Sequence, residues 1–419
     1  MEHQQRVVII GGGAAGIFAA AICSEMMPGV EVIVLEKTKQ LLSKVRISGG
    51  GRCNVTHAQF DLKKLVSNYP RGNKELLGPF HRFQPQDTIA WFKERGVELK
   101  TEEDGRIFPV TDSSETIIHC LLTAAKKGNV DIRCEHAVRS IEKNGDRFTL
   151  NLEKTAPLEC DYLILASGSN SHGHQLATSL GHSIVPPVPS LFTFNVPSSP
   201  LNDLTGISVE DVEISLKGTP FKQRGSLLIT HWGFSGPAAL KLSAWAARDL
   251  HACNYCTEIG INWIPSFKKE QALELLSQIK QQKPKKAFDH ENPFPLSMNL
   301  WKRLLTLSHI PLGTPMGHLA KKNLVSLTNR LTHSSFAQEG KTTYKQEFVT
   351  CGGISLKEVD FRTLESRLVK NLFFAGEVLD IDGVTGGFNF QNAWTTAYLA
   401  ASCIADRGSG NIVNKKIYI

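Results

Sequence analysis

The hydrophobic pattern near the start of the chain predicts a buried strand, a glycine-rich turn, a helix and a second strand. An apolar run over 7–10 leads into Gly11-x-Gly13-x-x-Gly16, and the second apolar run ends at Glu36, twenty residues after Gly16. This order and spacing are typical of a dinucleotide-binding turn. Gly11 permits the tight turn, Gly13 lets a pyrophosphate approach the backbone, and Gly16 allows close helix packing. Glu36 is placed to bind ribose hydroxyls.

Further periodic stretches predict the elements that follow. The polar, glycine-rich stretch 44–54 is expected to form a loop. A helix is expected over 87–95, with Asp87 as its N-cap, and an amphipathic helix over 114–127. Strands are expected as a turned pair within 97–110, and at 130–134, 137–142, 147–152 and 162–166.

The pattern changes after this first part. Five prolines punctuate residues 186–200, and from 194 to 264 short alternating stretches predict strands, as in a small barrel or sandwich. From 267 to about 331 the chain is helical in pattern and rich in lysine, and near Phe348 it becomes strand-like again. These shifts predict one discontinuous domain that carries an insertion.

A second glycine-to-helix junction lies far along the chain, within residues 371–401. An apolar strand leads into Gly376, an acidic turn holds Asp380 and Asp382, and Gly387 precedes a helical stretch. A dehydrogenase that binds only NAD has little use for a second junction, whereas FAD has two ends that need separate sites. The positive end of the second helix is expected to face the flavin edge where negative charge accumulates on reduction.

Several segments together resemble one family, the aminoacetone-oxidase-like (BaiN/YhiN-type) FAD-dependent oxidoreductases. They are GGGAAG at 11–16, SGGGRCNVT at 48–56, THWGFSGP at 230–237, TCGGI at 350–354, and the segment 374–394. The resemblance implies an α/β fold: a three-layer, Rossmann-like FAD-binding domain with a parallel sheet, an inserted β-rich, barrel-like domain and a small helical domain. The implied borders are 1–190 plus 346–419 for the FAD-binding domain, 191–265 for the β-rich domain and 266–345 for the helical part.

The resemblance also implies which residues hold non-covalent FAD. The residues implied to lie along the pyrophosphate are Gly11, Gly13, Ala15 and Gly16. The residues implied to bind the adenosine ribose are Glu36 and Lys37. Those at the ribityl chain and flavin are Arg46, Gly50, Gly51, Arg52 and Asn54. Val138 is implied to meet adenine through its backbone, and Ala166 and Gly168 to border the dinucleotide. Those flanking the isoalloxazine are Gly376, Glu377, Gly387, Phe388, Asn389 and Gln391.

The expected activity is that of an FAD-dependent oxidoreductase. It passes hydride through flavin N5 between a small organic substrate and NAD(P)H or oxygen, with NAD(P)H as a candidate reductant. No catalytic residue is identified. His231 and Arg52 are weak candidates, since a lone histidine is more often structural and an ion-pair role for the arginine is about as plausible. The alternative is a non-catalytic flavin-binding redox sensor or an RNA-associated flavoprotein, which the lysine-rich insertion motivates.

Composition and charge limit which kinds of binding partner are expected. The chain has 419 residues, a net charge of +7 and nine scattered cysteines, which fits a soluble protein of the reducing cytoplasm. Cys253-x-x-Cys256 lacks a second ligand pair, so no metal is expected. The lysine runs lack interleaved aromatics and are interpreted as solvated helix faces, so neither nucleic acid nor membrane is expected as a partner. The substrate's identity and the oligomeric state stay open.

Overall fold

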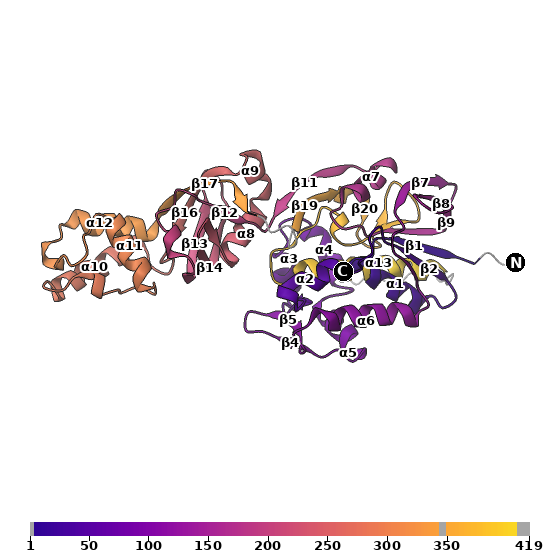
Figure 1. Cartoon of the computed structure of the whole chain (residues 1–419), viewed down its shortest axis with the longest axis horizontal. Helices are drawn as coiled ribbons and strands as arrows, with labels where there is room; N and C mark the ends of the chain where they lie inside the picture. Colours follow the sequence, from indigo (N-terminus) through magenta and orange to yellow (C-terminus); the bar gives the residue numbers. More distant parts are fainter. Residues whose placement is uncertain (1–3, 343–348, 409–419) are drawn as a thin grey trace. The chain divides into compact units, whose positions relative to one another are not determined.

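The computed structural model describes residues 4–342 and 349–408, and the chain has an α/β fold (Figure 1). It divides into two compact units, which are unit 1, residues 1–188 with 345–419, and unit 2, residues 189–344. The first border therefore lies at 188/189, close to the expected 190/191. The expected border at 345/346 and the return of strand pattern near Phe348 fall outside the described residues.

Unit 1 is built on a mainly parallel sheet. Its strands are β1 (Arg6–Ile10), β2 (Glu31–Leu35), β6 (Asp131–Arg133), β10 (Tyr162–Leu165), β20 (Val359–Asp360), β21 (Glu365–Ser366) and β22 (Leu372–Phe374). In the described residues the order is β20-β21-β22-β10-β1-β2-β6, with the last five parallel. β1 lies at the centre, where Val8 pairs with Leu163 on one side and Ile33 on the other. Such strands are covered on both faces, which explains their continuous apolar runs.

Two further layers cover this sheet (Figure 1). Helices α1 (Ala14–Met26), α6 (Ser114–Lys127) and α13 (Phe388–Gly408) pack together on one side. An antiparallel sheet of β7 (Val138–Asn144), β8 (Arg147–Leu152) and β9 (Leu158–Cys160) lies on the other. Phe18 of α1 contacts Trp394 of α13 edge-on, with ring centroids 5.3 Å apart. The expected three-layer domain is therefore present, and α6 begins and ends where the sequence predicts.

Shorter elements complete unit 1, and two expectations among them need correction. The elements are α2 (Ser43–Gly51), β3 (Thr56–His57), α3 (Leu62–Val66), α4 (Asn73–Phe80), α5 (Pro85–Glu94), β4 (Leu99–Thr101), β5 (Arg106–Pro109), α7 (Ser171–Ser179), β11 (Ile184–Ser190), β19 (Val349–Ile354), η4 (Leu356–Glu358) and η5 (Gly376–Val378). The expected loop 44–54 begins as helix α2, whose helical geometry breaks at 48–50. Asp87 is not the N-cap of α5. Gln84 is, because Pro85 suits the first helical turn, and the Asp87 carboxylate accepts from the Gln84 N–H at 2.8 Å.

Unit 2 contains a sheet that curls back on itself. Its strands are β12 (Thr193–Asn195), β13 (Ser208–Leu216), β14 (Lys222–Thr230), β15 (Gly233–Ser235), β16 (Cys256–Asn262), β17 (Ser334–Glu339) and β18 (Lys341–Thr342). Their order in the described residues is β17-β16-β13-β14-β15-β12-β18. The two outermost strands are consecutive in the chain and meet at Gly340, whose φ of +94° lets the backbone bend there. The sheet is thus barrel-like, as expected.

The helical part of unit 2 is not a separate domain. The helices of unit 2 are η1 (Asn202–Leu204), α8 (Pro237–Trp245), α9 (Ala247–Ala252), α10 (Lys269–Gln282), η2 (Phe288–His290), α11 (Met298–Leu307), η3 (Met316–His318) and α12 (Lys321–Thr332). The first three lie within 191–265, where the sequence pattern predicts strands alone, so that prediction was wrong at 237–252. One hydrophobic core includes Trp263 beside the sheet, Leu276 of α10, Trp301 of α11 and Leu327 of α12, all fully buried. The helical stretch also ends before the expected 345, because the alternating burial of 334–339 makes it strand β17.

Buried histidines make the stability of unit 1 depend on pH. The His182 ring nitrogen Nε2 lies 2.8 Å from the Ser366 hydroxyl, and burial lowers the pKa of the His182 and His174 imidazoles. Their ordinary pKa is about 6.5. The unfolded chain therefore takes up protons first as the pH falls through this value, so the folded state loses stability on acidification.

We expect the free energy of unfolding, measured in urea, to fall between about pH 7.5 and pH 5.5. The slope is up to about 1.4 kcal/mol per pH unit for each proton taken up. Carboxyl groups affect the stability only at lower pH. Asp360 is an example, because a hydrogen bond from Arg362 lowers its pKa. His182→Gln should flatten the slope, and the exposed control His81→Gln should not. A free energy of unfolding that stays constant or rises on acidification would show that the buried histidines do not control the stability of unit 1.

Candidate functional site

The turn from β1 to α1 exposes bare backbone at one glycine and packs tightly at the other two. A Cβ at Gly11 would lie 2.4 Å from the Ala166 carbonyl oxygen, and one at Gly16 would lie 1.9 Å from the Gly11 oxygen. Gly13 caps α1 with a φ of −85°, and a Cβ there would meet no atom within 4 Å. Open space therefore faces the N-terminus of α1, where backbone N–H groups and the helix dipole attract a phosphate.

Glu36 stands at the carboxyl end of β2, beside this turn. Its carboxylate accepts hydrogen bonds from the Gly12 N–H and from the Thr38 N–H, each at 2.8 Å. These bonds orient the side chain, and a carboxylate has further lone pairs that can accept from a ribose hydroxyl. Lys37 follows as an exposed residue, whereas Ala15 is buried inside α1.

The strand end at Gly376 lies against the first turn. A Cβ at Gly376 would come within 3.0 Å of the Ala15 Cβ, and the Gly376 N–H donates to the Thr396 hydroxyl of α13 at 2.9 Å. Gly168 has a φ of +62°, and a Cβ there would meet only the Glu377 carboxylate within 4 Å, at 3.8 Å. Residues of three separate segments thus border the same turn.

Segment 42–54 joins the two glycine junctions. At its start the Leu42 N–H donates to the Gly12 carbonyl at 2.9 Å. At its end the Asn54 amide, oriented to satisfy both partners, donates to the Thr56 carbonyl and accepts from the Gly387 N–H, each at 3.0 Å. Gly50 and Gly51 between them have positive φ, and Cβ atoms there would meet nothing within 4 Å. One short segment of the chain is therefore hydrogen-bonded to both glycine junctions.

Two arginines expected at the flavin are held by other partners. Arg46 forms an ion pair with Glu115 of α6. Arg52 donates to Glu102 at 2.6 Å, and its guanidinium lies 4.0 Å from the centre of the Phe108 ring. The hydrogen bond that Arg52 donates to the Glu102 carboxylate raises the pKa of Arg52. Both guanidiniums therefore have partners within the described structure.

The polar side chains at the start of α13 brace the fold. Gln391 is fully buried and accepts from the hydroxyls of Thr56 at 2.6 Å and Thr88 at 2.9 Å. Asn389 accepts from the Gly383 N–H at 2.8 Å and donates to the carbonyl of the same residue at 2.9 Å. These side chains therefore position the N-terminus of α13, and their place beside a flavin stays a prediction.

Aromatic rings and an imidazole pack around the remaining expected positions. The Phe388 ring stacks on His57, with centroids 4.7 Å apart and planes 19° from parallel. The Val138 carbonyl lies 2.6 Å from Nε2 of His172 on α7. Sequence reasoning missed this histidine as a partner of Val138, because nothing in the local pattern links residues so far apart.

A buried ion pair anchors the acidic turn before Gly387, and sequence reasoning missed it too. Arg71 donates through Nε to Asp382 at 2.5 Å, and the side chain of Asp382 is fully buried. Asp380 is also buried. Because the charge of Asp382 is paired inside the fold, its role is to hold the turn that leads to α13.

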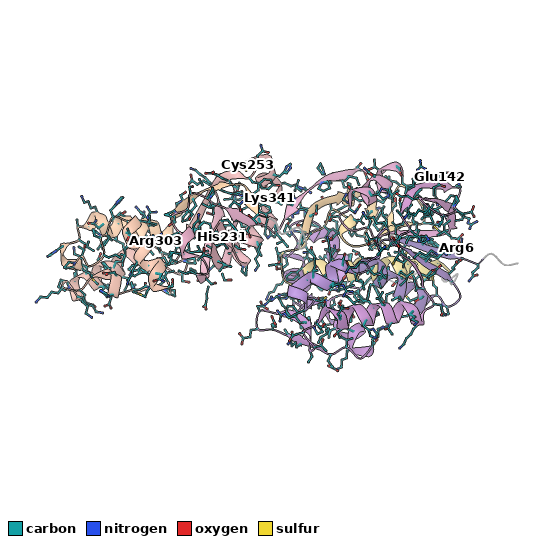
Figure 2. All side chains as sticks on the ribbon, viewed as in Figure 1. Arg6, Glu142, His231, Cys253, Arg303 and Lys341 are labelled. Atoms are coloured by element: carbon teal, nitrogen blue, oxygen red, sulfur yellow. The ribbon has the colours of Figure 1, made fainter. Side chains whose placement is uncertain are left out.

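The second weak catalytic candidate lies in unit 2. His231 is exposed at the turn between β14 and β15, with its ring centroid 3.8 Å from that of Trp232 (Figure 2). A Cβ at Gly233 in the same turn would lie 2.2 Å from the Phe194 oxygen. Close packing inside the barrel therefore explains why position 233 is a glycine. Arg52 and His231 belong to different units.

The cysteines in the described part of the chain are all free thiols. Cys53 is buried with φ +62°, and burial raises the pKa of its thiol to about 12, which keeps it protonated. Cys253 and Cys256 are exposed free thiols. The described residues contain no cluster of His, Cys, Asp and Glu that could hold a metal, and no helix long and apolar enough to cross a membrane.

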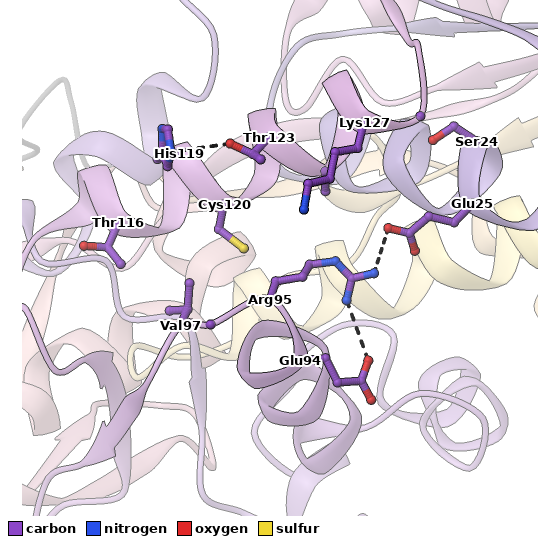
Figure 3. A pocket seen from close by; sticks show the side chains of 13 residues that line it. Ser24, Glu25, Glu94, Arg95, Val97, Thr116, His119, Cys120, Thr123 and Lys127 are labelled. Atoms are coloured by element: carbon purple, nitrogen blue, oxygen red, sulfur yellow. Dashed lines mark hydrogen bonds and ion pairs between the residues drawn. The ribbon is translucent and has the colours of Figure 1, made fainter.

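A cavity of about 840 Å³ lies elsewhere in unit 1 (Figure 3). It is lined by the end of α1, by α6 and by the residues after α5, where Arg95 contacts Glu25 at 2.7 Å and Glu94 at 3.7 Å. The site of the glycine turns is at the start of α1, whose 13 residues separate its ends by about 20 Å. This cavity is therefore not the dinucleotide site.

Comparison with known proteins agrees with the geometry. The HI0933-like protein Rossmann domain matches residues 5–403. The chain belongs to this family. The ribosomal RNA dihydrouridine synthase of Escherichia coli is 30% identical, over 94% of this chain and 96% of that protein. The 3-dehydro-bile acid delta(4,6)-reductase of Clostridium scindens is 27% identical, over 96% of this chain and 99% of that protein.

A solved structure shares the fold. The 3-ketosteroid-delta4-(5alpha)-dehydrogenase of Rhodococcus jostii RHA1 has a TM-score of 0.50 at 13% identity, over 96% of this chain and 98% of that chain. This protein is thus an FAD-dependent oxidoreductase with a Rossmann-type FAD-binding domain. The residues present fit FAD, since bare backbone at Gly13, Gly50 and Gly51 faces open space and Glu36 is held at the end of β2.

A methyl group at Gly13 tests the pyrophosphate site without disturbing the fold. Gly13→Ala should leave the melting temperature of the apoprotein within a few degrees, because the added Cβ meets no protein atom. It should lower FAD occupancy after purification severalfold, because the methyl group occupies the ligand's space. Gly78→Ala on α4, where a Cβ also meets nothing, is the matched control and should keep its FAD. Equal flavin content in the two variants would contradict the assignment of the pyrophosphate site to Gly13.

Removing the charge of Asp382 should destabilise unit 1. Asp382→Asn leaves Arg71 without its buried counter-charge, and we expect a loss of about 3 kcal/mol in the free energy of unfolding. The control is Asp211→Asn, which breaks an exposed pair with Arg224 and should cost less than about 1 kcal/mol. Urea denaturation followed by circular dichroism measures both. Similar small losses would show that the Arg71 pair does not anchor the turn.

Proposed function

We propose that this oxidoreductase uses NAD(P)H to reduce a carbon–carbon double bond conjugated to a carbonyl, and that its substrate is a uridine of ribosomal RNA. Two named relatives support the reaction class. Forming dihydrouridine saturates the ring double bond of uracil, which is conjugated to a carbonyl, and the bile acid reductase is named for a conjugated steroid. In both cases one carbon gains a hydride and its neighbour gains a proton.

The observation that carries the choice of RNA is the distribution of charge. Residues 189–344 hold 17 of the 47 Lys and Arg but only 11 of the 40 Asp and Glu, which is +6 of the net +7. Within them, residues 267–332 hold 11 basic and 4 acidic side chains. Such an excess attracts a polyanion at long range, whereas a steroid needs no comparable field. The sequence alone favoured no nucleic-acid partner, because it showed no interleaved aromatics.

The residues of unit 1 divide the binding of the cofactor among them. The N-terminus of α1 at Gly13 receives the pyrophosphate, and Glu36 accepts from the ribose. Asn54 fixes Gly387, so the positive end of α13 is held where it favours negative charge beside it. Bound FAD supplies the flavin that carries hydride from the nicotinamide to the substrate.

A small conjugated steroid is the second candidate substrate. The C. scindens relative matches this chain over nearly its full length and is named for such a reaction. The two candidates share the same class of reaction, and they differ in size and charge. Turnover with defined substrates therefore separates them.

The purified protein should be yellow, and NADPH or NADH should bleach its flavin band without oxygen. With in vitro transcribed ribosomal RNA added, nucleoside mass spectrometry should find uridine that has gained two hydrogens. Gly13→Ala protein lacking FAD is the negative control and should give none. Reduction of a conjugated dienone steroid, with no change in the RNA, would favour the second candidate and overturn the first.

A further inference from the structure

We propose that four exposed lysines at one end of the helical part of unit 2 form a surface that binds the phosphate backbone of RNA. We call Lys285, Lys286, Lys321 and Lys322 the lysine patch. The inference rests on the proposed function, because it names the surface by which unit 2 holds an RNA substrate. It adds a binding site on unit 2.

The fold brings two distant lysine pairs to the same place. One pair follows α10, and the other begins α12. Between them, the Gly317 N–H donates to the Pro284 carbonyl at 2.9 Å, and the Met316 N–H donates to the Lys286 carbonyl at 2.8 Å. Lys280, near the end of α10, donates to the carbonyl of Leu319, just before α12. The stretches around 284–287 and 315–319 therefore lie side by side. The first contains Lys285 and Lys286, and the second leads through Ala320 into Lys321 and Lys322.

The lysines of the patch are available to an external anion. All four are exposed. In the part of the chain that the structure describes, Lys285, Lys321 and Lys322 have no ion pair, and Lys286 has only a long contact of 3.9 Å with Glu291. Glu291 is bound more closely by Lys283, so it neutralises little of the patch.

Folding does not explain why these charges are here. Lys321 and Lys322 occupy the first two positions of α12, the end of a helix where a cation is unfavourable. Acidic side chains would stabilise this turn, yet α12 has none in its first turn. Lys321 and Lys322 therefore slightly oppose the local helix and form no ion pair in the described residues, which leaves both ammonium groups open to an outside anion.

The chemistry of the patch fits phosphates and not bases or lipid. Lysine ammonium groups are point charges suited to phosphate oxygens, and phosphate contacts position RNA without reading its sequence. The exposed apolar side chains of this part, Met298 and Leu312, are aliphatic and offer no stacking platform. The apolar faces of α10 and α12, which include Leu276 and Leu327, are buried in the core, so neither helix has a face to insert into a membrane.

The experiment measures binding of the full-length holoenzyme to in vitro transcribed ribosomal RNA across a range of salt. In the patch variant, Lys285→Gln, Lys286→Gln, Lys321→Gln and Lys322→Gln are combined. We expect the slope of log affinity against log salt to shrink by about 3, and the affinity near physiological salt to fall at least about tenfold. The matched control combines Lys93→Gln, Lys126→Gln, Lys154→Gln and Lys357→Gln, four exposed lysines of unit 1. Its slope and affinity should stay close to those of the wild type.

The readouts keep this inference separate from the proposed function. Flavin content and flavin reduction by NADPH should be unchanged in both variants. If the wild type makes no dihydrouridine but the patch variant alone loses RNA binding, the patch stands and the proposed function fails. If the wild type makes dihydrouridine and the patch variant keeps the wild-type slope, the patch is wrong.

Two further outcomes are decisive. If the fourfold variant loses its flavin or unfolds, the pair Lys321→Gln and Lys322→Gln is measured instead, and it should show about half the change in slope. An unchanged slope in the pair would overturn the inference. Polyglutamate that competes as well as RNA at equal charge would also overturn it, because the patch would then be a general acidic-protein surface.

Discussion

The bond between the Asn54 side chain and the Gly387 backbone is the interaction on which the site depends. It joins the end of segment 42–54 to the start of α13, and the Leu42 bond to Gly12 joins its beginning to the first turn. Two helix N-termini that are separated by most of the chain are thus linked through one segment, as a single FAD site would require. FAD needs this arrangement because its pyrophosphate and its flavin are far apart within one molecule.

Around this link, the other side chains act mainly through the backbone they hold. Gln391 and Asn389 fix the first turn of α13, and the buried Asp382 fixes the turn before it. The consequence is a site whose ligand-facing surface is largely main chain and glycine. Such a surface suits a large, phosphate-bridged cofactor.

The sequence predicted well whatever depends on local pattern. The glycine turn, the parallel strands and the bounds of α6 follow from hydrophobic periodicity and from the backbone freedom of glycine. Side-chain partners could not be predicted in this way. Arg52, for example, has Glu102 and Phe108 of a neighbouring hairpin as partners, and no local pattern shows either contact. Likewise three α-helices separate β17 from β16 along the chain, and the place of β17 in the barrel depends on its pairing with β16, which no local signal shows.

The most direct measurement is an experimental structure of the protein with FAD bound. The account predicts that the pyrophosphate lies against the Gly13 backbone at the N-terminus of α1, and that the isoalloxazine lies beside the start of α13 at Gly387. Electron density for FAD in the cavity at the far end of α1, beside Arg95 and Glu25, or density that reaches only one of the two glycine junctions, would contradict it.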